Sequence, residues 1–195
     1  MKKCDASQGV RLQDYRQQLV TGKVSSLVLQ HPLFLAMTVD LVAEEGDVVL
    51  MNRVDLYRRW IQQKLMRDFR SDRIIPVGWE NISLLIQAVI GLMLDAALSM
   101  TYQTESGIDL DDAIPECKLR FLASNRFGVE VESELYATTS LLEPVGERDC
   151  RDMHFRFFHR SFQEYFLAQA ICRDKLNVLG YPETVQGLVH ELLCV

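Results

Sequence analysis

The segment from Ile82 to Met100 is the most apolar stretch of this 195-residue chain, and no other segment limits the fold as much. Gln87 and Asp95 interrupt it, so we do not expect a membrane span there. The spacing instead predicts a strongly apolar helix over residues 80–99. The amino end has two lysines with no apolar stretch behind them, so no signal peptide is expected.

The remaining composition is that of a globular protein of one large or two small domains, with 48% hydrophobic and 25% charged residues. The formal net charge of -6 argues against nucleic acid and anionic membranes as partners, because a polyanion requires a basic surface. The cysteines are odd in number, scattered and without a CxxC pair, which favours free thiols in a reducing cytoplasm. They are Cys4, Cys117, Cys150, Cys172 and Cys194.

Apolar residues recur at helical spacing through the first 70 residues, which predicts helices there. Residues 10–20 predict a short amphipathic helix. The chain should bend at His31, because Pro32 disfavours helix before it and favours the first turn of a new one. That helix, residues 32–45, has apolar residues on nearly all faces, so we expect it to be deeply buried.

A long two-faced helix follows, capped by Asn52 or Asp55 and running to Phe69. Its basic residues and those just after it form either a solvated face or a docking surface for an acidic partner. They are Arg58, Arg59, Lys64, Arg67, Arg70 and Arg73. Residues 71–78 break the periodicity with a proline and a glycine, so we place a subdomain boundary there.

Three acidic residues, Asp109, Asp111 and Asp112, cluster in the segment Ile108–Pro115. Carboxylates stabilise the amino end of a helix, so we expect a short helix in this segment. The alternative, a cation site, lacks the glycine and distal glutamate of a calcium loop. Another helix is predicted around residues 132–137.

Two short β segments, Leu141–Val145 and Met153–Phe158, flank a polar turn and predict a hairpin. Helical periodicity resumes over Ser161–Leu176, and residues 182–194 could begin a further helix. Helix, short helices, hairpin and helix is the order of a winged-helix module. The expected fold is therefore mainly α: a helical bundle followed by a winged-helix-like subdomain with one short β-hairpin.

Several chemical motifs are missing from the chain. It has neither a GxxxxGK[ST] nor a GxGxxG loop, so no self-contained nucleotide site is predicted. The four histidines have no cysteine partners at metal-ligand spacing and form no HExxH, so we expect no metal site. No serine lies in a GxSxG motif. The partners of a Cys/His catalytic pair can be distant along the chain, so the sequence leaves such a pair open, but no positive feature supports one. We therefore expect no enzymatic activity from this chain.

His159 lies at the junction between the predicted hairpin and the helix that follows it. Backbone N–H groups and a ring nitrogen could together face an anion such as phosphate at this point. The alternative is structural, with His159 acting only as a helix cap.

The run around His159 closely resembles the end of the winged-helix domain of NACHT-type signal-transduction NTPases, the STAND class. These include NOD-like receptors and bacterial antiphage homologues. The matching residues are Phe157, His159, Ser161, Phe162, Glu164, Tyr165 and Ala168. Upstream, the runs at residues 30–35, 44–46 and 55–60 look like the helical lid that follows the nucleotide-binding domain of this family. The resemblance covers residues 10–180.

The resemblance implies two nucleotide contacts. The lid proline, here Pro32, would contact the adenine, and the winged-helix histidine, here His159, would hold the β-phosphate of ADP in the resting state. Walker A, Walker B and the sensor arginine precede the lid in this family and are missing here. The chain thus looks like a regulatory fragment that binds no cofactor alone and senses ADP or ATP beside a complete nucleotide-binding domain, the parent protein being an ATPase.

With the boundary at the break over residues 71–78, we expect residues 1–73 to form the lid, 74–176 the winged-helix-like subdomain, and 177–195 the start of a further helical region. The resemblance implies a cytoplasmic switch in innate immunity or antiphage defence. Its partners would be a nucleotide-binding domain, another protein or a second copy. The alternatives are a free-standing helical adaptor that binds a protein, with sticky apolar termini, and a winged-helix DNA binder, which the net charge disfavours.

Overall fold

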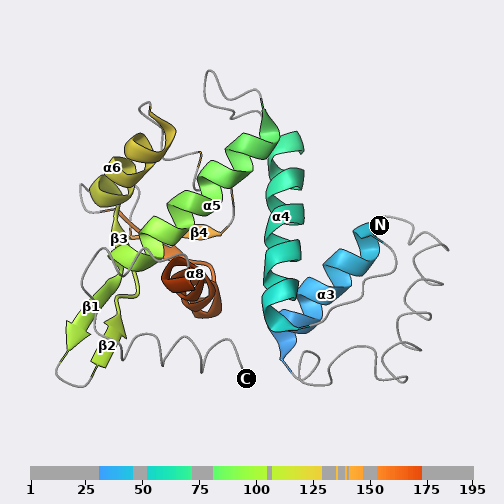
Figure 1. Cartoon of the computed structure of the whole chain (residues 1–195), viewed down its shortest axis with the longest axis horizontal. Coiled ribbons are helices and arrows are strands. Elements are labelled where there is room, and N and C mark those ends of the chain that lie inside the picture. Colours follow the sequence, from blue (N-terminus) through green and yellow to red (C-terminus); the bar gives the residue numbers. More distant parts are fainter. Residues whose placement is uncertain are drawn as a thin grey trace. The chain divides into compact units, whose positions relative to one another are not determined.

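The computed structural model of the chain describes residues 31–45, 52–71, 81–104, 107–128, 135, 139, 141–146 and 153–172. The chain divides into two compact units, Met1–Lys64 and Leu65–Val195. The described residues of both units are mostly helical, and Figure 1 labels their elements. The mainly α fold class is therefore confirmed.

Helix α3, Pro32–Glu45, begins where the sequence predicts, directly after a bend at His31. The carbonyl of His31 accepts the N–H of Leu35 at 3.0 Å, which starts the helix. The predicted deep burial of this helix was wrong. One face is buried, while Leu35 and Val39 on the other face are 43% and 39% exposed. The buried face consists of Phe34, Met37, Thr38, Leu41 and Val42.

Helix α4, Arg53–Ser71, is capped by Asn52 rather than Asp55. The side-chain oxygen of Asn52 accepts the N–H of Asp55 at 2.9 Å. Within the first unit, the ring of Tyr57 meets that of Phe34 edge-on at 5.6 Å. The indole of Trp60 donates to the carboxylate of Asp40 at 3.1 Å. These two contacts join α3 to α4.

Helix α5, Ile82–Ser99, is the apolar helix expected from the sequence. Asn81 caps it, with a side-chain oxygen that accepts the N–H groups of Ser83 at 3.0 Å and Leu84 at 3.3 Å. Among the described residues, α5 is the one helix long and apolar enough to cross a membrane by length and composition, but more than half of it is buried inside the protein. That burial is typical of a core helix.

Helix α6, Glu116–Phe127, and helix α8, Arg160–Cys172, both pack against α5 (Figure 1). Gly91 leaves room for the side chain of Arg126 from α6, since a Cβ there would lie 2.9 Å from Cζ of Arg126. The guanidinium of Arg126 pairs with the carboxylate of Asp95, one turn further along α5. Helix α6 ends at Gly128, whose φ of 70° is a conformation that glycine adopts readily.

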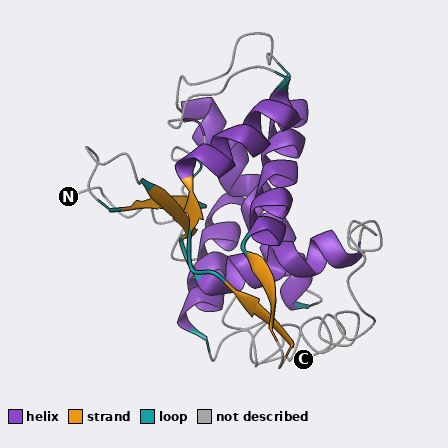
Figure 2. Ribbon diagram, turned by 90° about the vertical axis from the view of Figure 1, so that its left-hand side faces the viewer, coloured by secondary structure: helices purple, strands orange, loops and turns teal. Residues whose placement is uncertain are grey.

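Two separate sheets accompany these helices, drawn in orange in Figure 2. The predicted hairpin is confirmed as β4, Leu142–Val145, antiparallel to β5, His154–Phe157. Strand β3, Ile114–Pro115, adds to the other edge of β5 and gives the order β3-β5-β4. From α5 onward the order of elements is α5, β1, β2, β3, α6, β4, β5 and α8, which fits the expected winged-helix-like subdomain with an additional hairpin, β1 and β2, after α5.

The predicted short helix over Ile108–Pro115 was wrong. A second hairpin is present, with β1, Thr101–Thr104, antiparallel to β2, Gly107–Leu110. The carboxylate of Asp109 accepts the N–H of Leu110 at 2.8 Å within β2 instead of capping a helix. Helix α6 begins only after Pro115, and no side chain caps it.

Other predictions fall wholly or mostly outside the described residues. These are the helix over residues 10–20, the boundary at residues 71–78, the helix around residues 132–137 and the segment after residue 176. Within the third of these, Leu135 is described and is helical and buried. The assignment of residues 1–73, 74–176 and 177–195 to three subdomains stays a prediction.

Replacement of Asn81 by alanine is predicted to lower the free energy of unfolding by about 0.5–2 kcal/mol, because two N–H groups at the start of α5 lose their acceptor. Urea denaturation followed by circular dichroism measures the change. Asn125→Ala, at an exposed position inside α6, is the matched control and should leave stability nearly unchanged. Equal effects of the two substitutions would contradict the capping role.

Candidate functional site

The junction between β5 and α8 places His159 at the N-cap of α8. Strand β5 ends at Phe157, and the N–H of Phe158 donates to the carbonyl of Leu141 at 2.9 Å, which holds the chain beside β4. The carbonyl of His159 then accepts the N–H of Phe162 at 2.9 Å, in the first turn of the helix. His159 itself is exposed.

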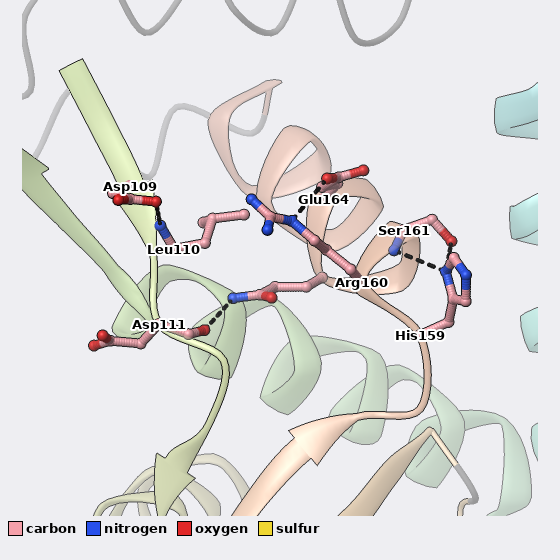
Figure 3. A network of polar contacts seen from close by, with 8 residues as sticks. Asp109, Leu110, Asp111, His159, Arg160, Ser161 and Glu164 are labelled. Carbon is pink, nitrogen blue, oxygen red and sulfur yellow. Dashed lines mark hydrogen bonds and ion pairs between the residues drawn. The ribbon is translucent and has the colours of Figure 1, made fainter. Parts of the chain in front are cut away.

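The imidazole of His159 closes back on the first turn of α8. Its Nδ1 accepts the backbone N–H of Ser161 at 3.1 Å, and the hydroxyl oxygen of Ser161 lies 2.7 Å from the same nitrogen (Figure 3). One N–H group of the helix start, which has no partner within the helix, is thereby satisfied. The capping alternative from the sequence therefore describes what the ring does in this structure.

Capping and anion binding use different atoms of the ring. Nδ1 faces Ser161, whereas Nε2 is on the other side of the imidazole. The ring is exposed at the amino end of a thirteen-residue helix, where the aligned peptide dipoles favour a negative charge. A histidine in this position can cap the helix and also donate a hydrogen bond to an oxygen of a ligand.

The first turns of α8 are anchored on the side away from His159. Figure 3 shows the side chain of Arg160 extending away from the imidazole toward Glu164, with which it forms an ion pair at 3.3 Å. Gln163 is only 4% exposed, and its amide donates to the carbonyl of Asp111 at 2.9 Å. Phe162 and Phe166 are buried, the latter ring 5.7 Å from that of Phe157. These contacts position the helix start that carries His159.

Pro32, the other predicted nucleotide contact, lies in the first unit. It is the exposed first residue of α3, where the missing N–H of proline costs no helical hydrogen bond. Beside it, the rings of His31 and Phe34 lie 4.9 Å apart, and Cζ of Arg53 lies 5.3 Å from the centroid of Phe34. Each predicted site residue is thus exposed at the start of a helix.

The other sequence candidates have structural partners. Asp109 bonds the adjacent N–H in β2, and the backbone of Asp111 bonds Met100 and Gln163. Arg58 pairs with Asp55, and the ammonium of Lys64 lies 5.7 Å from the ring of Trp60. Within the described part of the chain, no three His, Cys, Asp or Glu side chains cluster in a way that could hold a metal ion.

Two polar residues of the site have structural roles that the sequence did not predict. Ser161 holds the His159 ring, and Gln163 ties α8 to the segment after β2. A serine two residues after an N-cap residue is a local sequence signal for a side-chain contact at the start of a helix. The bond from Gln163 joins residues 52 positions apart, and no pattern in the sequence marks it.

Comparison of the chain with models of protein families and with curated proteins found no match.

Replacement of His159 by alanine in this chain is predicted to lower the free energy of unfolding by about 1 kcal/mol, because the N–H of Ser161 loses its acceptor. His159→Asp should retain stability, since a carboxylate accepts the same N–H and its charge suits the helix start. Urea denaturation of the three proteins measures both effects. An aspartate variant as unstable as the alanine variant would contradict the capping geometry.

Proposed function

We propose that this chain is the helical lid and winged helix of a NACHT-type NTPase, a regulatory segment that holds ADP in the resting state. The closed lid would limit oligomerisation in defence or stress signalling. The proposal is supported by the sequence resemblance, by the winged-helix-like order of elements and by the position of His159.

The position of His159 is the observation that carries the proposal. The ring is exposed at the start of α8, and its orientation is set by two contacts with Ser161. A phosphate oxygen that reached this point would find an imidazole donor and the positive end of a helix dipole. A preorganised donor loses little conformational entropy when a ligand binds, so the contact is favourable even if it is the only one on this subdomain.

A lid that contacts nucleotide acts as a two-state element. Contacts at His159 and Pro32 would exist only in the closed arrangement, so they stabilise that arrangement over the open one. Movement of the lid away from the nucleotide then exposes the surfaces that the closed arrangement covers. A tenfold preference for the closed state requires a difference of about 1.4 kcal/mol, which one or two charge-assisted hydrogen bonds can supply.

The proposal assigns no catalysis to this chain, because the sequence carries no phosphate-binding loop. Phosphate transfer would belong to a nucleotide-binding domain, which is the proposed partner. We propose a cytoplasmic location, in keeping with scattered cysteines, of which Cys117 and Cys172 are exposed free thiols in the described part of the chain.

Release of labelled ADP from a NACHT nucleotide-binding domain that lacks its own lid tests the proposal. Addition of this chain should slow release about tenfold or more, and His159→Asp should abolish the effect, because a carboxylate keeps the helix cap but repels phosphate. The control is titration of ADP against the chain alone, which should show no tight binding. Tight binding of ADP by the isolated chain would refute the lid function. So would an aspartate variant that slows ADP release as much as the unchanged chain does.

A second candidate, a helical adaptor that binds another protein, is favoured by exposed apolar side chains. Phe121 on α6 is 64% exposed, Phe158 is 56% exposed and Leu84 is 53% exposed. Large apolar groups on a surface are typical of contact sites for a partner. The apolar chain termini considered for this role lie outside the described residues.

The adaptor function predicts that the chain binds a protein partner without any NTPase and that Phe121→Ser weakens this binding at least tenfold. Asn125→Ser, at another exposed position of α6, is the matched control and should bind as the unchanged chain does. A pull-down followed by measurement of the dissociation constant provides the comparison. Equal affinities of the two variants would exclude Phe121 as a contact residue.

A further inference from the structure

The contacts between Ser161 and His159 determine which ring nitrogen carries the proton. The backbone N–H of Ser161 points at Nδ1 from 3.1 Å, and a backbone amide can only donate. A proton on Nδ1 would therefore face the amide proton directly. Nδ1 must be the unprotonated nitrogen, and the proton of the neutral ring must lie on Nε2.

The hydroxyl of Ser161 reinforces this tautomer. Its oxygen lies 2.7 Å from Nδ1, a normal distance for an O–H donor. Because Nδ1 carries no proton, the hydroxyl must donate and the ring nitrogen must accept. The two donors of one residue converge on one acceptor and fix both the tautomer and the orientation of the ring.

We propose that Ser161 is a positioning residue that holds His159 as the neutral Nε2–H tautomer, so that the ring offers one N–H donor to a phosphate oxygen of a nucleoside diphosphate. This inference rests on the proposed lid function. An analogous arrangement is common where a second group sets the tautomer of a histidine that binds a ligand through its other nitrogen. Ser161 acts through the ring and does not itself contact the nucleotide.

The positioning role explains why a serine serves at this place. A hydroxyl on the second residue of the helix can turn its proton toward Nδ1, whereas an alanine leaves only the amide. With one donor lost, rotation of the ring and the Nδ1–H tautomer become more accessible. The donor at Nε2 is then presented for only part of the time, and the apparent affinity for the ligand falls with that fraction.

The tautomer is measured directly by nitrogen-15 NMR of the imidazole in the intact chain without nucleotide. His159 should show an unprotonated Nδ1 and a protonated Nε2. Ser161→Ala should show a measurable population of the other tautomer, and Ser161→Thr, which retains a hydroxyl, should restore the original spectrum. A proton on Nδ1 in the unchanged chain, or a spectrum that Ser161→Ala does not alter, overturns the proposal.

The consequence for nucleotide is measured by the release of ADP from a lidless NACHT nucleotide-binding domain. Ser161→Ala should speed release at least threefold relative to the unchanged chain, and Ser161→Thr should rescue it. If His159→Asp abolishes retention but Ser161→Ala changes neither the tautomer nor the release, this inference fails while the lid function stands. If Ser161→Ala changes the tautomer but His159→Asp leaves the release of ADP unchanged, the lid function fails. The role assigned to the Nε2 donor then fails with it.

Discussion

Burial of the apolar helix α5 is the constraint on which the second unit depends. Its buried residues surround the helix instead of following one stripe, so a single neighbour cannot remove them from water. Helices α6 and α8 both pack against it, and transfer of each large side chain from water contributes about 1.5–3 kcal/mol. At Gly91 the absence of a side chain makes room for Arg126 of α6, which pairs with Asp95.

The position of the candidate site follows from this packing. Helix α8 buries Phe162 and Phe166, and Gln163 bonds the backbone of Asp111, so its first turn has a defined place on the subdomain. Strand β5 leads into that turn from the hairpin that it forms with β4. His159 is therefore exposed at the start of a helix that buried contacts hold in place, as a preorganised donor of the proposed kind requires.

Local patterns in the sequence predicted the elements whose signals are also local. Pro32 begins α3, Asn52 caps α4, and the hairpin before α8 occurs where alternating residues flank a polar turn. The acidic cluster misled the prediction, because carboxylates bond nearby N–H groups in strands and turns as well as at helix starts. That segment forms a strand because β2 pairs with β1. Such cross-strand pairing depends on a partner strand that the local sequence does not show.

The sequence by itself determined most helix positions and the absence of a phosphate-binding loop, and it marked His159 as a candidate residue. The tertiary structure decided which face of α3 is buried, that Asp109 lies in a strand, and that the ring of His159 accepts bonds at Nδ1. These features depend on contacts between side chains and backbone in three dimensions. Residue type and spacing state which groups are present, whereas packing alone selects the rotamer and the partner of each one.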